Sequence, residues 1–144
     1  MPDNETNITN RLEELADDFS YLEDWETRYR HIIDMGRGLQ PLAEAEKNEN
    51  TKVRGCVSQV WLVQEFDKVN NQIILRGESD STLVQGLLSV LIFIYSGSNP
   101  EEVLSLPPEN VFETLGLIDA LTPSRANGLK SMAGRIVEFA KLNA

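Results

Sequence analysis

The mostly apolar run LVQGLLSVLIFIY, residues 83–95, restricts the fold more than any other stretch of the chain. Gln85, Gly86 and Ser89 interrupt it, and it is shorter than the roughly 20 residues that a membrane-spanning helix needs. We therefore predict a helix buried in a protein core at about residues 82–95, with Asp80 or Ser81 as its N-cap. The N-terminal sequence MPDNETN lacks the basic and apolar regions of a secretory signal, which favours a cytoplasmic protein without membrane contact.

The N-terminal half predicts two helices followed by a hairpin. Apolar residues at helical spacing indicate a first helix over residues 8–19. Ser20 and Glu23 form a capping-box pattern that would open a second helix, which Gly36, Gly38 and Pro41 would end. The charged segment 43–55 is a surface loop with room for a helical turn. Residues 57–66 and 73–76 have strand composition, and DKVNNQ between them predicts an antiparallel hairpin. A third edge strand is compatible with this pattern but cannot be placed.

The C-terminal half predicts further helices. Asn99 and Thr122 are candidate N-caps, each followed by a proline at the first helical position, and PPENVFETLGL between them is a short helix. The last helix carries an apolar stripe of Ala126, Leu129, Met132, Ala133, Ile136, Val137 and Ala140. This order predicts an α+β fold, a small antiparallel sheet packed against helices, in a single domain over residues 1–144 with residues 1–7 frayed.

The charge balance restricts the partners. Asp and Glu number 23 against 13 Lys and Arg, a formal net charge of -10. A nucleic-acid-binding protein needs a basic face, and an anionic membrane surface would repel this chain. The acidic balance suits a partner that presents a basic patch.

The inventory of reactive side chains is small. With one cysteine and one histidine, the chain cannot form an internal disulfide, a Cys/His zinc site or an iron–sulfur cluster of its own. A Ser–His–Asp triad would need His31. That residue lies in a predicted helix, so we interpret it as a surface or half-buried helix residue and not as a catalytic base. The acidic pairs are typical of solvated helix faces.

Cys56 admits two interpretations. Free cysteines are often buried and inert. However, this one follows a loop and Gly55, and Lys52 and Arg54 are close in sequence, where a cation would lower the pKa of the thiol. Gly55 leaves space for the approach of a partner and allows the loop to bend. A reactive thiol without a histidine base or a second cysteine is suited to accepting a group and passing it on.

Four segments resemble the SufE family of sulfur acceptors: VRGCVSQVWL around Cys56, DWETRYRHIIDMGRGLQPL, GESDSTLVQGLLSVL and LTPSRANGLKSM. They occur in the family's order and cover about residues 15–132. Val57 is a departure, because many members carry glutamine there. The family fold is similar to that of IscU-type iron–sulfur scaffolds, which need several cysteines where this chain has one.

The resemblance implies a function in sulfur transfer. Cys56 would take persulfide sulfur from a pyridoxal-phosphate-dependent cysteine desulfurase (SufS-like), stimulate its turnover and pass the sulfur to an iron–sulfur scaffold (SufBCD-like). The chain would be an accessory protein rather than an enzyme, with no pyridoxal phosphate, other cofactor or metal of its own, and a monomer or weak homodimer. One alternative is an allosteric activator that carries no sulfur. Another is a thiol peroxidase or hydrolase, for which no base or resolving cysteine is evident.

The resemblance also suggests residues around the thiol. Asp80, Glu113 and Arg125 match polar positions near the family's cysteine loop and desulfurase contact. Arg125 would stabilise anionic sulfur or bind a partner carboxylate, or it would simply be exposed in the first turn of its helix. The first interpretation is favoured because a cation there opposes the helix dipole, and some interaction must offset that cost. Asp80 would equally serve as a helix cap. Ser58 and Gln59 would donate hydrogen bonds to the sulfur or order the start of the strand, and Arg54 would act on the thiol or on the partner.

Overall fold

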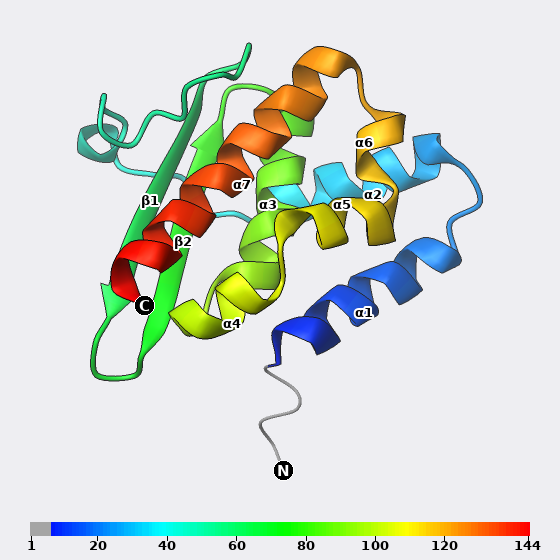
Figure 1. The fold of residues 1–144 in the computed structure, drawn as a ribbon. Helices are drawn as coiled ribbons and strands as arrows, with labels where there is room; N and C mark the ends of the chain where they lie inside the picture. Colours follow the sequence, from blue (N-terminus) through cyan, green and yellow to red (C-terminus); the bar gives the residue numbers. More distant parts are fainter. Residues whose placement is uncertain (1–6) are drawn as a thin grey trace.

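A two-stranded sheet and a layer of helices enclose one central helix in the computed structural model, which describes residues 7–144 (Figure 1). The helices of the described part are α1 (Ile8–Ser20), α2 (Trp25–Arg37), α3 (Thr82–Tyr95), α4 (Pro100–Ser105), α5 (Pro108–Leu115), α6 (Leu117–Ala120) and α7 (Pro123–Asn143), with a 3-10 turn, η2, at Glu44–Glu46. The strands are β1 (Val60–Asp67) and β2 (Gln72–Ser79). The predicted α+β fold is confirmed. Of the segment predicted to be frayed, residues 1–6 lie outside the described residues, and Asn7 caps α1.

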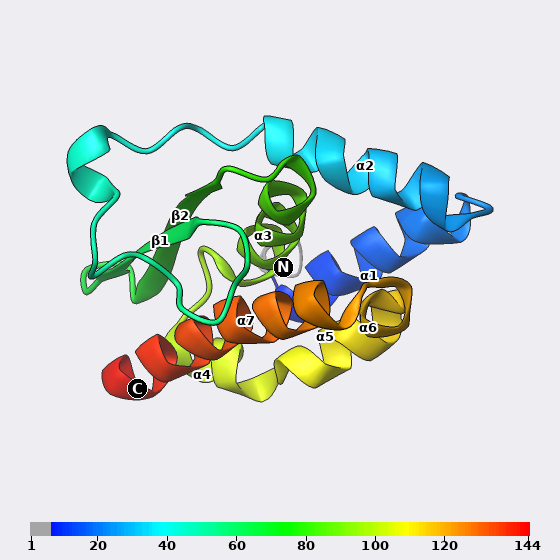
Figure 2. The ribbon, with the colours of Figure 1, turned by 90° about the horizontal axis from the view of Figure 1, so that it is seen from above.

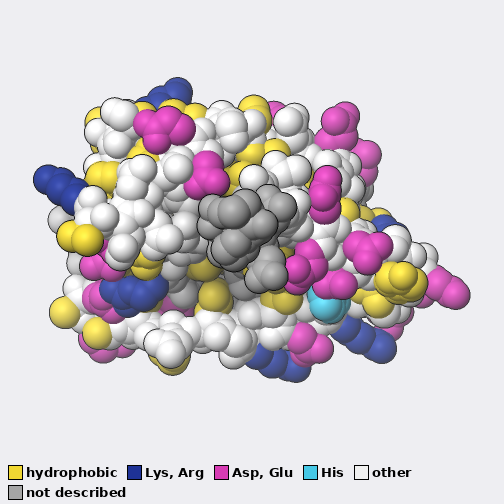
Figure 3. Space-filling view, turned by 90° about the horizontal axis from the view of Figure 1, so that it is seen from below, with side chains coloured by type: hydrophobic (Ala, Val, Ile, Leu, Met, Phe, Trp, Pro, Cys, Tyr) yellow, Lys and Arg dark blue, Asp and Glu magenta, His cyan; other side chains and the backbone are white. Residues whose placement is uncertain are grey.

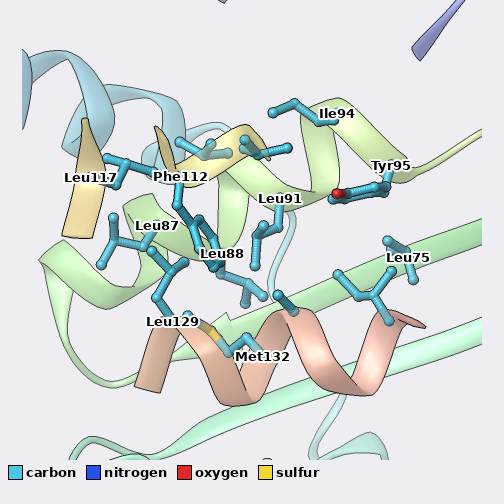
Figure 4. Packing of buried hydrophobic residues seen from close by; sticks show 14 of the residues in the cluster. Leu75, Leu87, Leu88, Leu91, Ile94, Tyr95, Phe112, Leu117, Leu129 and Met132 are labelled. Carbon is cyan, nitrogen blue, oxygen red and sulfur yellow. The ribbon is translucent and has the colours of Figure 1, made fainter. Parts of the chain in front are cut away.

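The central helix is α3, as the apolar run predicts. The Ser81 side chain accepts a hydrogen bond from the Val84 backbone N–H, so Ser81 rather than Asp80 is the N-cap. The helix contacts β2, α1, α2 and α7. Its side chains form the middle of the core shown in Figure 4, where Leu87, Leu88 and Leu91 meet Phe112, Leu129 and Met132 from the later helices. In the described part of the chain, no helix has both the length and the apolarity needed to cross a membrane.

Two glycines let α2 and α3 cross at backbone contact. A Cβ atom added to Gly86 would lie 2.6 Å from the carbonyl oxygen of Ile32, and one added to Gly36 would lie 2.8 Å from the Gly86 nitrogen. Gly36 was predicted to stop α2, and this is wrong: it is buried inside the helix, which continues to Arg37. Its conformation is ordinary, and its missing side chain is what the packing requires.

Helix starts follow local side-chain chemistry. The predicted caps Asn99 and Thr122 are confirmed, each with a proline following it. The capping box at Ser20 is wrong, because Ser20 ends α1 and its hydroxyl donates to the Asp17 carbonyl. Asp24 caps α2 instead and accepts from the Thr27 N–H at 2.8 Å. A carboxylate at the N-cap also complements the helix dipole.

The hairpin is antiparallel, with Val60 opposite Ser79 and Asp67 opposite Gln72. The first strand begins at Val60 instead of residue 57, because residues 54–59 form a loop. No third strand is found in residues 7–144, but Lys52 makes an isolated antiparallel bridge with Trp61 on the free side of β1. Figure 2 shows this segment passing from the sheet onto α7.

The segment 39–53 crosses the outer face of the hairpin and is held there by charges. Arg76 in β2 pairs with Glu46 in η2, and this contact lowers the pKa of Glu46 to about 2. Lys47 pairs with Glu78 of β2 at 3.2 Å and lies over the Trp61 ring. Most other acidic side chains are exposed, and Figure 3 shows several of them on the α1 half of the underside.

We predict that Gly86→Ala destabilises the protein and Gly134→Ala does not. The first change puts a methyl group into the backbone of α2 and should lower the free energy of unfolding by about 1–3 kcal/mol or more. Gly134 lies within α7 with nothing within 4 Å of an added Cβ. Alanine there should stabilise by about 0.5–1 kcal/mol through its helix propensity. Urea unfolding of both variants tests this, and equal effects would contradict the close-packing argument.

Candidate functional site

Cys56 lies near the tip of a loop formed by residues 54–59, here called the Cys56 loop. The loop leaves and re-enters the sheet at one hydrogen bond, from the Val53 N–H to the Val60 carbonyl at 2.8 Å. Val53 and Val60 are buried, whereas Arg54, Gly55, Val57 and Gln59 are exposed. The thiol is therefore carried on a surface loop whose two ends are fixed in the core.

The thiol sits against the first turns of α7. Cys56 Sγ donates to the Gly128 carbonyl at 3.6 Å, a weak hydrogen bond of the kind that thiols make. A Cβ on Gly128 would lie 3.4 Å from Sγ, so glycine gives the sulfur direct access to the helix backbone. Gly55 has φ +89°, a conformation that favours glycine, and a Cβ there would come to 2.6 Å from Ser131 Oγ. Gly55 thus allows the close approach of the loop to α7, and the thiol lies against the helix backbone at Gly128.

A cavity of about 350 Å³ opens beside the thiol. Its apolar floor comes from α3 and α7 and consists of Val84, Leu87, Leu129 and Met132. Its polar rim comes from the loop and the start of α7 and consists of Ser58, Thr122, Ser124 and Arg125. The cavity therefore offers the sulfur an apolar environment inside and a cation at the entrance.

The electrostatics of the thiol differ from the sequence-based expectation. Burial raises the pKa of Cys56 above its ordinary value, so the predicted lowering by Lys52 and Arg54 is wrong. Arg54 is exposed and donates to Glu49 at 3.1 Å, so its charge is neutralised by a neighbour in the loop. Half-burial of a thiol favours the protonated form. At neutral pH the resting thiol is therefore protonated.

The other predicted residues divide into two groups. Ser58 and Arg125 line the Cys56 cavity. Asp80 adjoins the loop, where its carboxylate accepts from the Gln59 N–H at 3.0 Å and its own N–H donates to the Gln59 carbonyl at 3.2 Å. Asp80 therefore holds the end of the loop and is not the cap of α3. Glu113 lies apart, in a separate hollow with Asp119 and Lys130.

Sequence reasoning missed Gly128, whose carbonyl accepts the thiol hydrogen bond. The available signal was its position inside α7, where a glycine costs helix stability and usually has a packing reason. Within residues 7–144, no three His, Cys, Asp or Glu side chains come together in a way that could hold a metal ion.

Residues 13–140 match the family described as SufE, Fe-S metabolism associated domain. The chain belongs to the SufE family. It is 40% identical over 146 residues to an uncharacterized SufE-like protein of Rhizobium etli, covering 100% of this chain and 99% of the relative. It is 39% identical over 127 residues to an uncharacterized SufE-like protein of Rhizobium meliloti, covering 87% of this chain and 91% of the relative. Membership implies a role in iron–sulfur metabolism.

The fold is similar to a solved structure as well. The solution structure of a hypothetical protein from Thermus thermophilus aligns with a TM-score of 0.76 at 20% identity, covering 92% of this chain and 95% of the other. This similarity supports the SufE-like α+β fold that the sequence predicts.

We predict that the Cys56 thiol titrates at higher pH in the folded than in the unfolded protein. The alkylation rate, measured from neutral to alkaline pH, should have its inflection above the value of about 8.5 expected for a free thiol in urea. Because the raised pKa belongs to the folded state, its stabilising effect is present below about pH 8.5 and is lost as the pH rises through the folded pKa.

The matched variant is Arg54→Ala, which should leave the inflection in place, since that guanidinium pairs with Glu49. Two results would support a thiol pKa lowered by nearby cations. One is an inflection below that of the unfolded chain, and the other is a large upward shift of the inflection in Arg54→Ala.

Proposed function

We propose that this protein accepts sulfur on Cys56 from the persulfide of a cysteine desulfurase and carries it toward iron–sulfur cluster assembly in the cytoplasm. The observation that carries the proposal is the placement of the single thiol: it lies on a surface loop and faces a cavity with an apolar floor and an arginine at its rim. SufE family membership supplies the iron–sulfur context.

The transfer step is a thiol–disulfide-type exchange. The Cys56 thiol first loses its proton, and the thiolate attacks the outer sulfur of the partner's persulfide. A new S–S bond forms on Cys56 as the old one breaks, and the partner's cysteine leaves as a thiolate that takes up a proton. No net oxidation occurs, and the partner regains its free thiol for another cycle. The pyridoxal phosphate that generates the sulfur belongs to the partner, as the family resemblance implies.

The resting environment favours protection over reactivity. The thiolate is the nucleophile, and burial raises the pKa of Cys56, so a protonated half-buried thiol reacts slowly with stray oxidants. Reaction with a partner then requires the loop to present Cys56 in a different environment. Val57, next to the thiol, is 86% exposed and offers the partner an apolar contact at the loop tip. The partner supplies the activation that the free protein lacks.

We expect one extra sulfur on the protein after incubation with its desulfurase and cysteine. Intact-mass analysis without reductant should show the adduct on the native chain and none on Cys56→Ser. Absence of the adduct in the native chain would overturn the proposal.

The same assay distinguishes carriage from activation alone. If the protein were only an allosteric activator, saturating Cys56→Ala would stimulate the desulfurase as well as the native chain does. We expect that variant to bind the desulfurase but to leave its turnover at the basal level, because no acceptor thiol is present.

We further expect Arg125→Ala to slow persulfide formation on Cys56 by about two- to fivefold, the scale of a partly solvated charge interaction. Arg125→Lys should keep most of the rate because the cation remains at the cavity rim. Lys130→Ala, which removes an exposed cation elsewhere on α7, is the control. Single-turnover mass analysis gives the rates, and equal rates in Arg125→Ala and Lys130→Ala would remove Arg125 from the site.

A further inference from the structure

Arg135 of α7 binds the backbone just before the Cys56 loop. Its Nη1 donates to the Lys52 carbonyl at 2.8 Å, and its Nη2 donates to the Asn50 carbonyl at 2.9 Å. These partners are 83 and 85 residues away in the chain. A guanidinium suits this arrangement because its donors form a rigid planar fork, whereas a lysine ammonium is a single point charge.

The Lys52 carbonyl, one of the two that Arg135 binds, forms no hydrogen bond with β1. Thr51 and Val53 face β1, since the Thr51 carbonyl accepts from the Leu62 N–H and the Val53 N–H donates to the Val60 carbonyl, both at 2.8 Å. Successive residues of an extended segment direct their backbone groups to opposite sides, so Lys52 faces away from β1. Its N–H donates to the Asn48 carbonyl, and its carbonyl accepts from Arg135. Arg135 thus completes the outer edge of this short pairing.

The same face of α7 contacts the tip of the loop in a different way. Gly128, Ser131 and Arg135 follow one another at spacings of three and four residues and so lie on one face of the helix. At the tip, α7 offers small groups: the Gly128 carbonyl accepts the weak thiol hydrogen bond, and Ser131 lies over Gly55. At the base, α7 offers a charged fork. The hydrogen bonds from Arg135 place residues 50–53 beside α7, and Figure 2 shows the chain before β1 reaching this helix.

From this contrast we infer that Arg135 is a positioning residue. It fixes residues 50–53 to α7, so that only the part of the Cys56 loop between this anchor and Gln59, which Asp80 holds, moves when Cys56 is presented. The inference rests on the proposed function for the reason that Cys56 must move. The contacts that fix residues 50–53 belong to the free protein and do not depend on that function. With the base fixed, the thiol returns after each opening to the same hydrogen bond and cavity. Without Arg135, the Lys52 carbonyl loses its partner, the pairing of residues 51–53 with β1 loosens, and the thiol leaves α7 more often.

The test measures opening in the free protein, so it is independent of any desulfurase. We expect Arg135→Gln to raise the rate of Cys56 alkylation at neutral pH by roughly tenfold, the scale of one lost hydrogen bond in an opening equilibrium. Arg135→Lys should give a smaller increase, since one carbonyl can still be bound. Amide hydrogen exchange at Val53, whose N–H closes the loop, should accelerate in parallel.

Two controls separate positioning from general stability. The Asn99 carboxamide caps α4 by accepting a hydrogen bond from the Glu102 N–H. Asn99→Ala removes this cap and lowers the stability of the protein at a place that does not contact the loop. Lys141→Ala removes an exposed cation from the same helix as Arg135. Both should leave Cys56 alkylation and Val53 exchange in dilute buffer unchanged. The inference is overturned if the Arg135 variants label at the native rate, or if Asn99→Ala labels as fast as Arg135→Gln. If the native chain gains no persulfide, the proposed function is overturned, but the inference about Arg135 is not.

Discussion

The backbone contact of α2 and α3 at Gly36 and Gly86 determines how deeply α3 is buried, and the remaining elements are arranged around that helix. Interiors are packed as densely as crystals, so an apolar helix needs a neighbour on every side. Here α2 covers one side at backbone contact, and β2, α1 and α7 cover the others. The cavity beside Cys56 depends on this arrangement, because its floor is formed where Val84 and Leu87 of α3 meet Leu129 and Met132 of α7. The depth of α3 therefore sets the position of the surface on which the thiol rests.

The Cys56 loop combines firm ends with a weakly held tip. Its ends are tied by backbone hydrogen bonds at Val53 and Gln59, the latter to Asp80. Its tip meets α7 through a sulfur hydrogen bond and the contact of Gly55 with Ser131. Weak local interactions open at low free-energy cost while the global fold remains closed. The distribution of contacts thus allows motion of the thiol without disturbance of the core.

Local chemistry made much of the fold predictable from the sequence. Asn99 and Thr122 were identified correctly because a cap depends on the residues that immediately follow it. The predicted capping box at Ser20 is wrong because Asp24, four residues later, caps α2 with a charged acceptor. The long-range features were not predictable in this way. The packing role of Gly36 depends on Gly86, and the contacts of Arg135 lie more than eighty residues away along the chain. Sequence patterns record periodicity within an element but not which residues meet across elements.

The pKa of Cys56 was predicted wrongly for the same reason: the sequence does not show which elements surround the thiol. Adjacent cations suggested a thiolate ready to react, but Arg54 turns to Glu49, while α7 and α3 surround the sulfur with apolar side chains. Burial then raises the pKa of the nucleophile, which would be a defect in an enzyme that acts alone. In a carrier it is an advantage, because sulfur bound to an exposed cysteine would be lost to any competing thiol before delivery. Under the proposed function, a thiol that reacts only after leaving the cavity would confine the chemistry to the moment when a partner has bound. In the proposed function, the apolar floor and the weakly held loop tip are therefore two parts of one mechanism, in which burial suppresses side reactions and the loop relieves that burial.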